Sequence, residues 1–151
     1  MEDQPKSRPQ ELRERTKKFA IRTVRLFRSL PKTDEERVLG KQVLRSGTSV
    51  GANYRAVCRA RSRAEFLSKI GVVLEEADET EFWLELLVDV GIIESGKMKD
   101  LLTEAGELIR IFSAPQQTSR KRRAKQSPNR SITQSPNGPV TQSLDRQIAQ
   151  L

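Results

Sequence analysis

Hydrophobic residues recur along this chain with the 3.6-residue period of amphipathic helices, in four consecutive segments. The first segment covers 11–30, and its apolar side chains share one face of a helical wheel. They are Leu12, Phe19, Ala20, Val24, Phe27 and Leu30. Pro31 predicts where this helix ends, because proline disfavours helical geometry in the residue before it.

The second segment opens with a capping box, in which Thr33 is followed three residues later by Glu36. Its periodicity predicts a helix over 34–61. The apolar stripe consists of Leu39, Val43, Leu44, Val50, Tyr54, Val57 and Cys58. Because Cys58 falls on the apolar side, we expect it to be a small buried hydrophobe rather than a reactive thiol.

The last two helices have similar signals at their ends. Ser62 and Glu65 form a second capping box that opens the third helix, and Gly91 is placed to stop it. The fourth helix begins at Ser95 or Gly96 and is predicted to end before Pro115.

Four amphipathic helices with short links predict an all-α fold, an antiparallel up-down four-helix bundle over 11–113. Residues 1–10 are polar with two prolines and predict a disordered lead. Residues 114–151 are rich in Gln, Ser, Pro and basic side chains, and an eight-residue repeat begins at Ser127. We interpret 114–151 as a disordered basic tail.

Composition argues against catalysis. The chain contains no His and one Cys, which excludes a Ser-His-Asp triad, a His general base and Cys-rich zinc sites. The carboxylates of the third helix lack the His of a bundle di-iron site, so we expect no metal or other cofactor. No apolar run approaches a membrane span, and the polar N-terminus does not resemble a signal peptide. These features predict a cytoplasmic protein without enzymatic activity or a membrane partner.

Charge is strongly polarised along the chain. Residues 6–63 hold 17 basic and 5 acidic side chains, whereas 64–113 hold 4 basic and 12 acidic ones. Residues 114–151 hold 7 basic and 1 acidic. Nucleic acid is one partner that such a bias indicates. The alternative is that basic and acidic helices face each other, within one subunit or between subunits.

A basic stripe on one side of the second helix carries the nucleic-acid hypothesis. Its members are Arg37, Lys41, Arg45, Arg55 and Arg59, and Arg61 and Arg63 follow at the next link. The tail adds Arg120, Lys121, Arg122, Arg123 and Lys125. Such a stripe can follow a phosphate backbone. No aromatic platform accompanies it, so base stacking is not indicated. Alternatively, the arginines pair with acids of the third helix, such as Glu75, Glu76, Asp78 and Glu79.

Poor helix formers interrupt the middle of the second helix, where each Gly costs about 1 kcal/mol relative to Ala. We interpret them as a helix-packing motif that lets another backbone approach closely. Its members are Ser46, Gly47, Ser49, Gly51, Ala52 and Asn53. A ligand or RNA site at the same place is the alternative.

Three residues of the third helix depart from its pattern. Glu81 falls within the apolar face and requires a partner if buried, which we expect to be a donor from 46–53 or an arginine of the second helix. If the helix bends, Glu81 instead reaches water. Phe82 and Trp83 lie off the main stripe and indicate an intersubunit contact.

Several of these motifs together resemble a known family. Residues 42–53 read QVLRSGTSVGAN, residues 61–66 read RSRAEF, and Gly91-Ile92-Ile93 follows the Glu-rich third helix. Over 12–113 the chain resembles the four helix bundle proteins encoded by intervening sequences in 23S rRNA genes. The chain departs from the family's usual pattern at 54–56, and the resemblance does not explain the tail.

This resemblance implies an antiparallel bundle that assembles into a homo-oligomeric ring, commonly a pentamer. Related accessory proteins of diversity-generating retroelements bind nucleic acid and a reverse transcriptase through a basic surface. No catalytic residues carry over. The family motif falls on Arg45, Ser46, Ser49, Gly51, Ala52 and Asn53, which we interpret as structural.

The sequence therefore predicts a non-enzymatic, homo-oligomeric bundle that binds RNA or DNA through a basic surface. The alternative function is a protein-interaction scaffold, in which the basic and acidic helices join subunits or a partner protein.

Overall fold

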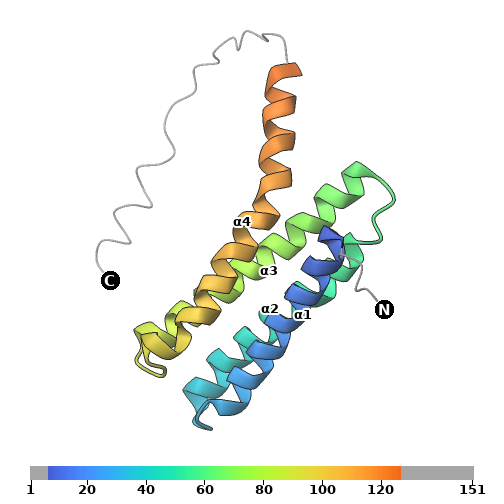
Figure 1. Cartoon of the computed structure of the whole chain (residues 1–151). Helices are drawn as coiled ribbons and strands as arrows, with labels where there is room; N and C mark the ends of the chain where they lie inside the picture. The colour runs from blue at the N-terminus through green and yellow to red at the C-terminus, as the bar shows by residue number, and fades with distance from the viewer. Residues whose placement is uncertain (1–6, 127–151) are drawn as a thin grey trace, which may run out of the picture.

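A computed structural model describes residues 7–126, which form four α-helices and no strand. In chain order, α1 is Arg8–Ser29, α2 is Asp34–Val57, α3 is Arg63–Asp89 and α4 is Ser95–Gln126. Successive helices run antiparallel and lie side by side (Figure 1). The predicted all-α, up-down four-helix bundle is therefore confirmed.

The ends of α1 show how local sequence sets the helix boundaries. Ser7 caps the start, and its backbone N–H donates to Gln10 Oε1 at 3.1 Å, so the helix begins at Arg8 rather than at residue 11. The expected lead is correspondingly shorter, and its residues 1–6 lie outside the described range. Leu30 is extended ahead of Pro31, as predicted for a residue that precedes proline.

The other capping signals have mixed outcomes. Ser62 Oγ accepts from the backbone N–H of Glu65 at 3.1 Å, so the predicted cap of α3 forms. Thr33 precedes α2, but its side chain makes no capping hydrogen bond, so that predicted box is wrong. Gly91 has a φ of +77°, in the left-handed region that favours glycine, and it follows α3 as expected.

The helix α2 ends four residues earlier than expected, at Val57. The predicted burial of Cys58 is consequently wrong: this residue caps the helix and is exposed. The wheel argument failed because it extended helical periodicity past the point where the chain turns towards α3. Cys58 is therefore an exposed residue at the link between α2 and α3, and its side chain hydrogen-bonds to that of Tyr54.

The fourth helix continues past Pro115, contrary to the prediction that it ends there. Proline removes one backbone hydrogen bond and crowds the preceding turn, which bends a helix without necessarily ending it. Residues 116–126 contain good helix formers such as Gln, Arg and Lys and no Gly. We call 115–126 the α4 extension. The expected disorder is wrong for 114–126, and the octad repeat lies outside the described residues.

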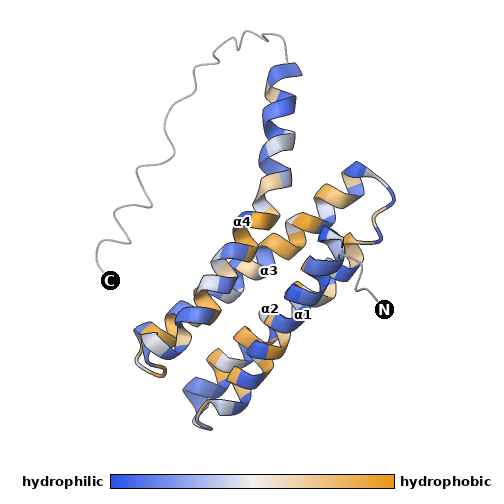
Figure 2. Cartoon of the chain, viewed as in Figure 1, coloured by the Kyte–Doolittle hydropathy of each residue, from blue (hydrophilic) through white to orange (hydrophobic). Residues whose placement is uncertain are grey.

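The apolar stripes of the four helices meet in one core. Figure 2 shows hydrophobic and hydrophilic segments alternating along the helices of the bundle, whereas the α4 extension is almost entirely hydrophilic. The largest fully buried side chains include Phe19, Val43, Val50, Val73, Leu84, Leu87, Met98, Leu108 and Phe112. Within residues 7–126, no helix has the length and apolar character needed to cross a lipid bilayer.

The backbones of α1 and α2 approach closely where α2 has glycine. A Cβ atom added to Gly47 would lie 2.5 Å from Thr23 Cγ2 and 2.9 Å from Thr23 Cβ. At Gly51 the same atom would lie 3.1 Å from the carbonyl oxygen of Thr16. Both threonines are fully buried. The glycines therefore make room for α1 against α2.

A buried hydrogen bond joins α2 to α3 at the same level. The Thr80 hydroxyl donates to Ser46 Oγ at 2.9 Å, and Ser46 donates to the carbonyl of Gln42 at 2.9 Å. Both side chains are inaccessible to solvent. Because a buried hydroxyl without a partner is costly, this pair fixes the register of the two helices.

Ion pairs join the first and last helices, and we call this group of Arg15, Glu104 and Glu107 the charged clasp. Arg15 Nε lies 2.6 Å from Glu104 Oε1, and Arg15 also pairs with Glu107. These hydrogen bonds, first that with Glu104, raise the pKa of Arg15, so its guanidinium remains charged. The clasp closes the bundle between α1 and α4.

Glu81 turns towards α4 rather than towards α2. A Cβ on Gly106 would lie 3.1 Å from Glu81 Oε1, so the carboxylate lies against the backbone of α4. The expected partner in 46–53 or on an arginine of α2 is therefore wrong. Burial raises the pKa of Glu81, and the charges of Glu85 and Asp78 add to the effect.

We expect Gly47→Ala to lower the free energy of unfolding by about 1–3 kcal/mol, because Thr23 Cβ cannot move away by side-chain rotation. Helix propensity alone would favour alanine by about 1 kcal/mol. Gly96→Ala is the control, since a Cβ there meets no atom within 4 Å. Urea denaturation measures the free energy of unfolding of both variants and of the parent protein. A Gly47→Ala variant at least as stable as the parent would contradict the close approach.

We expect Glu81→Gln to stabilise the protein at pH 7. The raised pKa means that the folded state penalises the carboxylate, so the glutamine removes a cost that exists only while Glu81 is ionised. The gain should shrink as pH falls through the raised pKa and vanish below the ordinary value of the unfolded chain. Thermal unfolding between pH 3 and 8 measures this, with exposed Glu75→Gln as the control. A pH-independent difference would rule out the explanation.

Candidate nucleic-acid interface

A groove runs between the outer faces of α1 and α2, with a volume of about 760 Å³. Short residues form its floor, namely Ala20, Thr48, Gly51 and Ala52. Four basic side chains line it: Arg13 and Lys17 from α1, Arg55 from α2, and Arg59 just beyond the end of α2. We call this feature the α1–α2 groove. Its depth follows from the small residues, because long side chains at those positions would fill the space between the helices.

The basic side chains of the groove have no acidic partner within residues 7–126. None of Arg13, Lys17, Arg55 and Arg59 takes part in an ion pair there, and all four are exposed. Glu14 is the one acidic side chain among the described groove residues. A cleft lined mainly by one sign of charge concentrates its field and attracts counter-ions. Arginine in particular presents planar donors that match phosphate oxygens.

Arg45, in the same predicted stripe, lies on the other side of α2 and pairs with α3. Its Nη1 is 3.5 Å from Glu76 Oε2, and its Nη2 pairs with Glu79. Trp83 Nε1 donates to Glu79 Oε1 at 3.0 Å, which extends this network. Burial raises the pKa of Glu76, although Arg45 opposes the shift. The alternative interpretation of the stripe, pairing with acids of α3, thus describes Arg45.

The remaining stripe residues are exposed but do not line the groove. Arg37 donates to the backbone carbonyl of Lys32 at 3.4 Å, and Lys41 is exposed one turn further along α2. The structure therefore divides the predicted stripe into three environments rather than one continuous surface.

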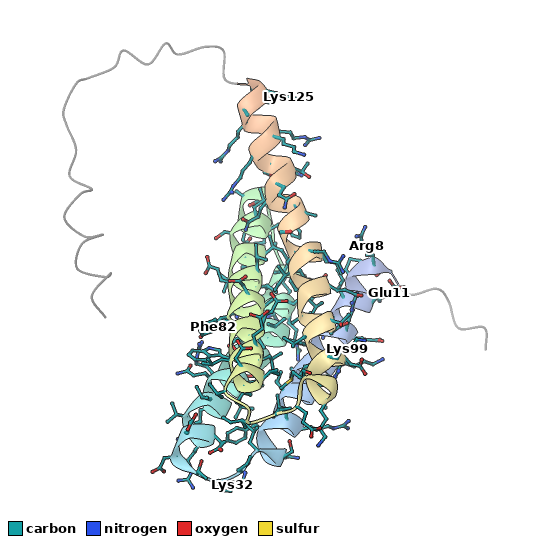
Figure 3. The ribbon with its side chains drawn as sticks, turned by 90° about the vertical axis from the view of Figure 1, so that its left-hand side faces the viewer. Arg8, Glu11, Lys32, Phe82, Lys99 and Lys125 are labelled. Atoms are coloured by element: carbon teal, nitrogen blue, oxygen red, sulfur yellow. The ribbon has the colours of Figure 1, made fainter. Side chains whose placement is uncertain are left out.

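A second basic surface lies where α3 begins. Arg61 and Arg63 are exposed there, and Arg63 Nη2 donates to Ser119 Oγ of α4 at 3.3 Å. The tail cations are exposed on the α4 extension, near whose far end Lys125 lies in Figure 3. They are Arg120, Lys121, Arg122, Arg123 and Lys125. A furrow of about 680 Å³ between the helices, the α3–α4 furrow, is lined by Arg63, Arg120, Arg122 and Arg123 among others.

The helix-packing residues divide between the two faces of α2. Ser46 and Gly47 are buried, and Ser49, Gly51 and Asn53 are half-buried. Ala52 is exposed in the α1–α2 groove. One short segment therefore supplies both a contact surface for α1 and the floor of the groove.

The acidic residues of α3 show no metal-binding arrangement. Glu75, Asp78 and Glu85 are exposed, and among residues 7–126 no group of three acidic, His or Cys side chains could hold a metal ion. Their charge instead faces solvent, α2 or α4.

An aromatic pair lies on the surface of α3. Phe82 is 53% exposed and projects outward, as Figure 3 shows. Its ring meets that of half-buried Trp83 edge-on, with the centroids 4.9 Å apart. An exposed aromatic pair of this kind is typical of protein contact surfaces.

Sequence reasoning missed the contribution of α1 to the groove. Arg13 and Lys17 are spaced i, i+4 in the sequence, as are Arg55 and Arg59 at the end of α2 and just beyond it. A search for basic pairs at i, i+4 spacing beside small residues would have selected both pairs as candidates for one groove. A helical wheel of α1 alone cannot show which helix lies beside these cations.

Comparison with known proteins identifies the family. The 23S rRNA-intervening sequence protein family matches residues 9–114, and no curated protein matches the chain. A crystal structure from Bacteroides thetaiotaomicron, of a protein of unknown function from the S23 ribosomal protein family, is 38% identical, with a TM-score of 0.63. The match covers 68% of this chain and 94% of that chain. The α4 extension lies beyond the family match. This chain belongs to the 23S rRNA-intervening sequence protein family.

Proposed function

We propose that this protein is a non-enzymatic, cytoplasmic, homo-oligomeric bundle that binds the phosphate backbone of RNA or DNA. The observation that carries the proposal is the α1–α2 groove, with four basic side chains that have no acidic partner in the described chain. Membership of an rRNA-related family is consistent with this location and ligand class.

The groove suits a backbone rather than a particular base sequence. Its floor offers methyl groups, a hydroxyl and a glycine, with no aromatic ring on which a base could stack. The nearby Tyr54 is buried, and its ring centroid is 5.6 Å from that of Phe112 in the core. Specificity in such a groove would come from backbone shape and charge.

The magnitude of the expected binding follows from counter-ion release. Four phosphate contacts give a slope of about −3.6 in log K against log salt on B-form DNA. Affinity should then fall by about 100-fold between 50 and 200 mM salt. The chemistry requires no catalytic group, and the chain contains no His.

We expect Arg55→Ala/Arg59→Ala to weaken binding to a nucleic-acid duplex and to reduce the salt slope by about 2. Each arginine that contacts one phosphate contributes about 0.9 to that slope. Fluorescence anisotropy at several salt concentrations measures it, with labelled DNA and RNA duplexes.

The matched control is Lys97→Ala/Lys99→Ala, which removes the same charge from exposed positions of α4. Its slope should stay close to that of the parent protein. Equal losses in both variants would show that net charge, rather than the groove, governs binding. An unchanged slope in the arginine variant would exclude the groove.

The second candidate function is a protein-interaction scaffold. The pair of exposed Phe82 and half-buried Trp83 favours it, together with exposed Val72 on the same helix and exposed Val90 at its C-terminal cap. In this function the basic face of α2 meets the acidic face of α3 on another subunit. A ring such as a pentamer would satisfy both functions if its interface left the groove open.

Charge reversal distinguishes the two functions. We expect Arg55→Glu/Arg59→Glu to abolish nucleic-acid binding while the oligomer mass, measured by size exclusion with light scattering, stays unchanged. The physical reason is that both arginines are exposed and line the α1–α2 groove, whereas the aromatic pair of the scaffold hypothesis lies on α3. A variant that dissociates into smaller species would instead assign these arginines to assembly.

A further inference from the structure

The α4 extension contacts the bundle through its first residues, 115–119. Gln116 lies over Gly71 of α3, where an added Cβ would come within 2.7 Å of the Gln116 amide nitrogen. Ser119 accepts the hydrogen bond from Arg63. From Arg120 to Gln126 every side chain is exposed, so the helix leaves the bundle as a single rod (Figure 1).

This rod carries charge of one sign on all sides. Five of the six residues in 120–125 are basic, and 114–126 contain no acidic residue. Pairs such as Arg120 with Arg123 and Lys121 with Lys125 are helical neighbours, and like charges at this spacing destabilise a helix. No ion pair within residues 7–126 offsets the repulsion. A bound polyanion would remove it.

The composition of the rod favours nucleic acid over a protein groove as its partner. A helix that docks on a protein presents an apolar stripe at i, i+3 and i+4. Residues 116–126 offer Ala124 as their one apolar side chain. A partner that contacts a single face would also leave the cations of the other faces unused, whereas a groove between two phosphate strands surrounds the helix with negative charge.

We propose that the α4 extension enters the major groove of duplex DNA, while one phosphate strand lies in the α3–α4 furrow against Arg63 and Arg123. An α-helix with its side chains is about 10–12 Å across, and the major groove of B-form DNA is about 12 Å wide. The major groove of an A-form RNA duplex is deep and narrow, so the extension should discriminate against it. The inference rests on the proposed nucleic-acid binding, but its central element, the α4 extension, lies beyond the family match.

The test uses the full chain and a variant with Arg120→Ala, Arg122→Ala and Arg123→Ala. Alanine is the best helix former, so the extension stays helical. The probes are a guanine-containing DNA duplex of about 20 base pairs and the RNA duplex of the same sequence. Methylation of guanine N7 by dimethyl sulfate reports directly on the major groove. Binding at several salt concentrations provides the second readout.

We expect the parent protein to protect guanine N7 and to bind the DNA duplex at least 10-fold more tightly than the RNA duplex. The triple variant should lose N7 protection and most of this preference, and its salt slope should fall by about 3. Arg55→Ala/Arg59→Ala serves as the control that keeps N7 protection while weakening overall binding.

Bound DNA without N7 protection, or equal affinity for both duplexes, would overturn the major-groove placement and leave the α1–α2 groove intact. A triple variant with unchanged DNA binding but a changed oligomer mass would assign the extension to a protein contact. If Arg55→Ala/Arg59→Ala binds DNA as tightly as the parent protein, while the triple variant loses N7 protection, the proposed function of the α1–α2 groove fails and this inference stands. Absence of duplex binding by the parent protein would overturn both.

Discussion

The close approach of α1 and α2 is the constraint on which the rest of the structure depends. Gly47 and Gly51 leave no side chain between the helices, so Thr23 and Thr16 pack directly against the backbone of α2. The neighbouring Ala52 faces outward and is equally short. The spacing that closes the core on one side of α2 therefore opens the α1–α2 groove on the other. Packing and the candidate binding surface are two consequences of the same small residues.

The fold also divides the positive charge of α2 between structure and surface. Arg45 is used within the subunit, since it pairs with Glu76 and Glu79 of α3. Arg55 and Arg59 line the α1–α2 groove instead, where the neighbouring helix is itself basic, and they form no ion pair within residues 7–126. The contrast between the basic and acidic halves of the sequence is thus only partly neutralised by folding. The positive charge that is not neutralised is concentrated beside α1 and on the α4 extension. This unpaired charge supports a polyanionic partner.

Much of the fold could be predicted from the sequence, because helical periodicity, the Pro31 stop and the left-handed Gly91 are local signals. The features that could not be predicted depend on neighbours distant in sequence. Glu81 lies against Gly106 of α4, and the groove needs α1 and α2 side by side, so neither can be deduced from one helical wheel. Pro115 shows a different limit, because a proline predicts a disturbed hydrogen bond but not whether a good helix-forming sequence continues beyond it.

The central claim is that the α1–α2 groove holds a phosphate backbone, and amide chemical shifts test it most directly. The protein, labelled with ¹⁵N, would be titrated with a short unlabelled duplex. The account predicts that the largest shift changes within the bundle fall on the groove floor, at Ala20, Thr48, Gly51 and Ala52, none of which carries charge. Shift changes that leave these four amides unaffected, with binding still observed, would contradict the account.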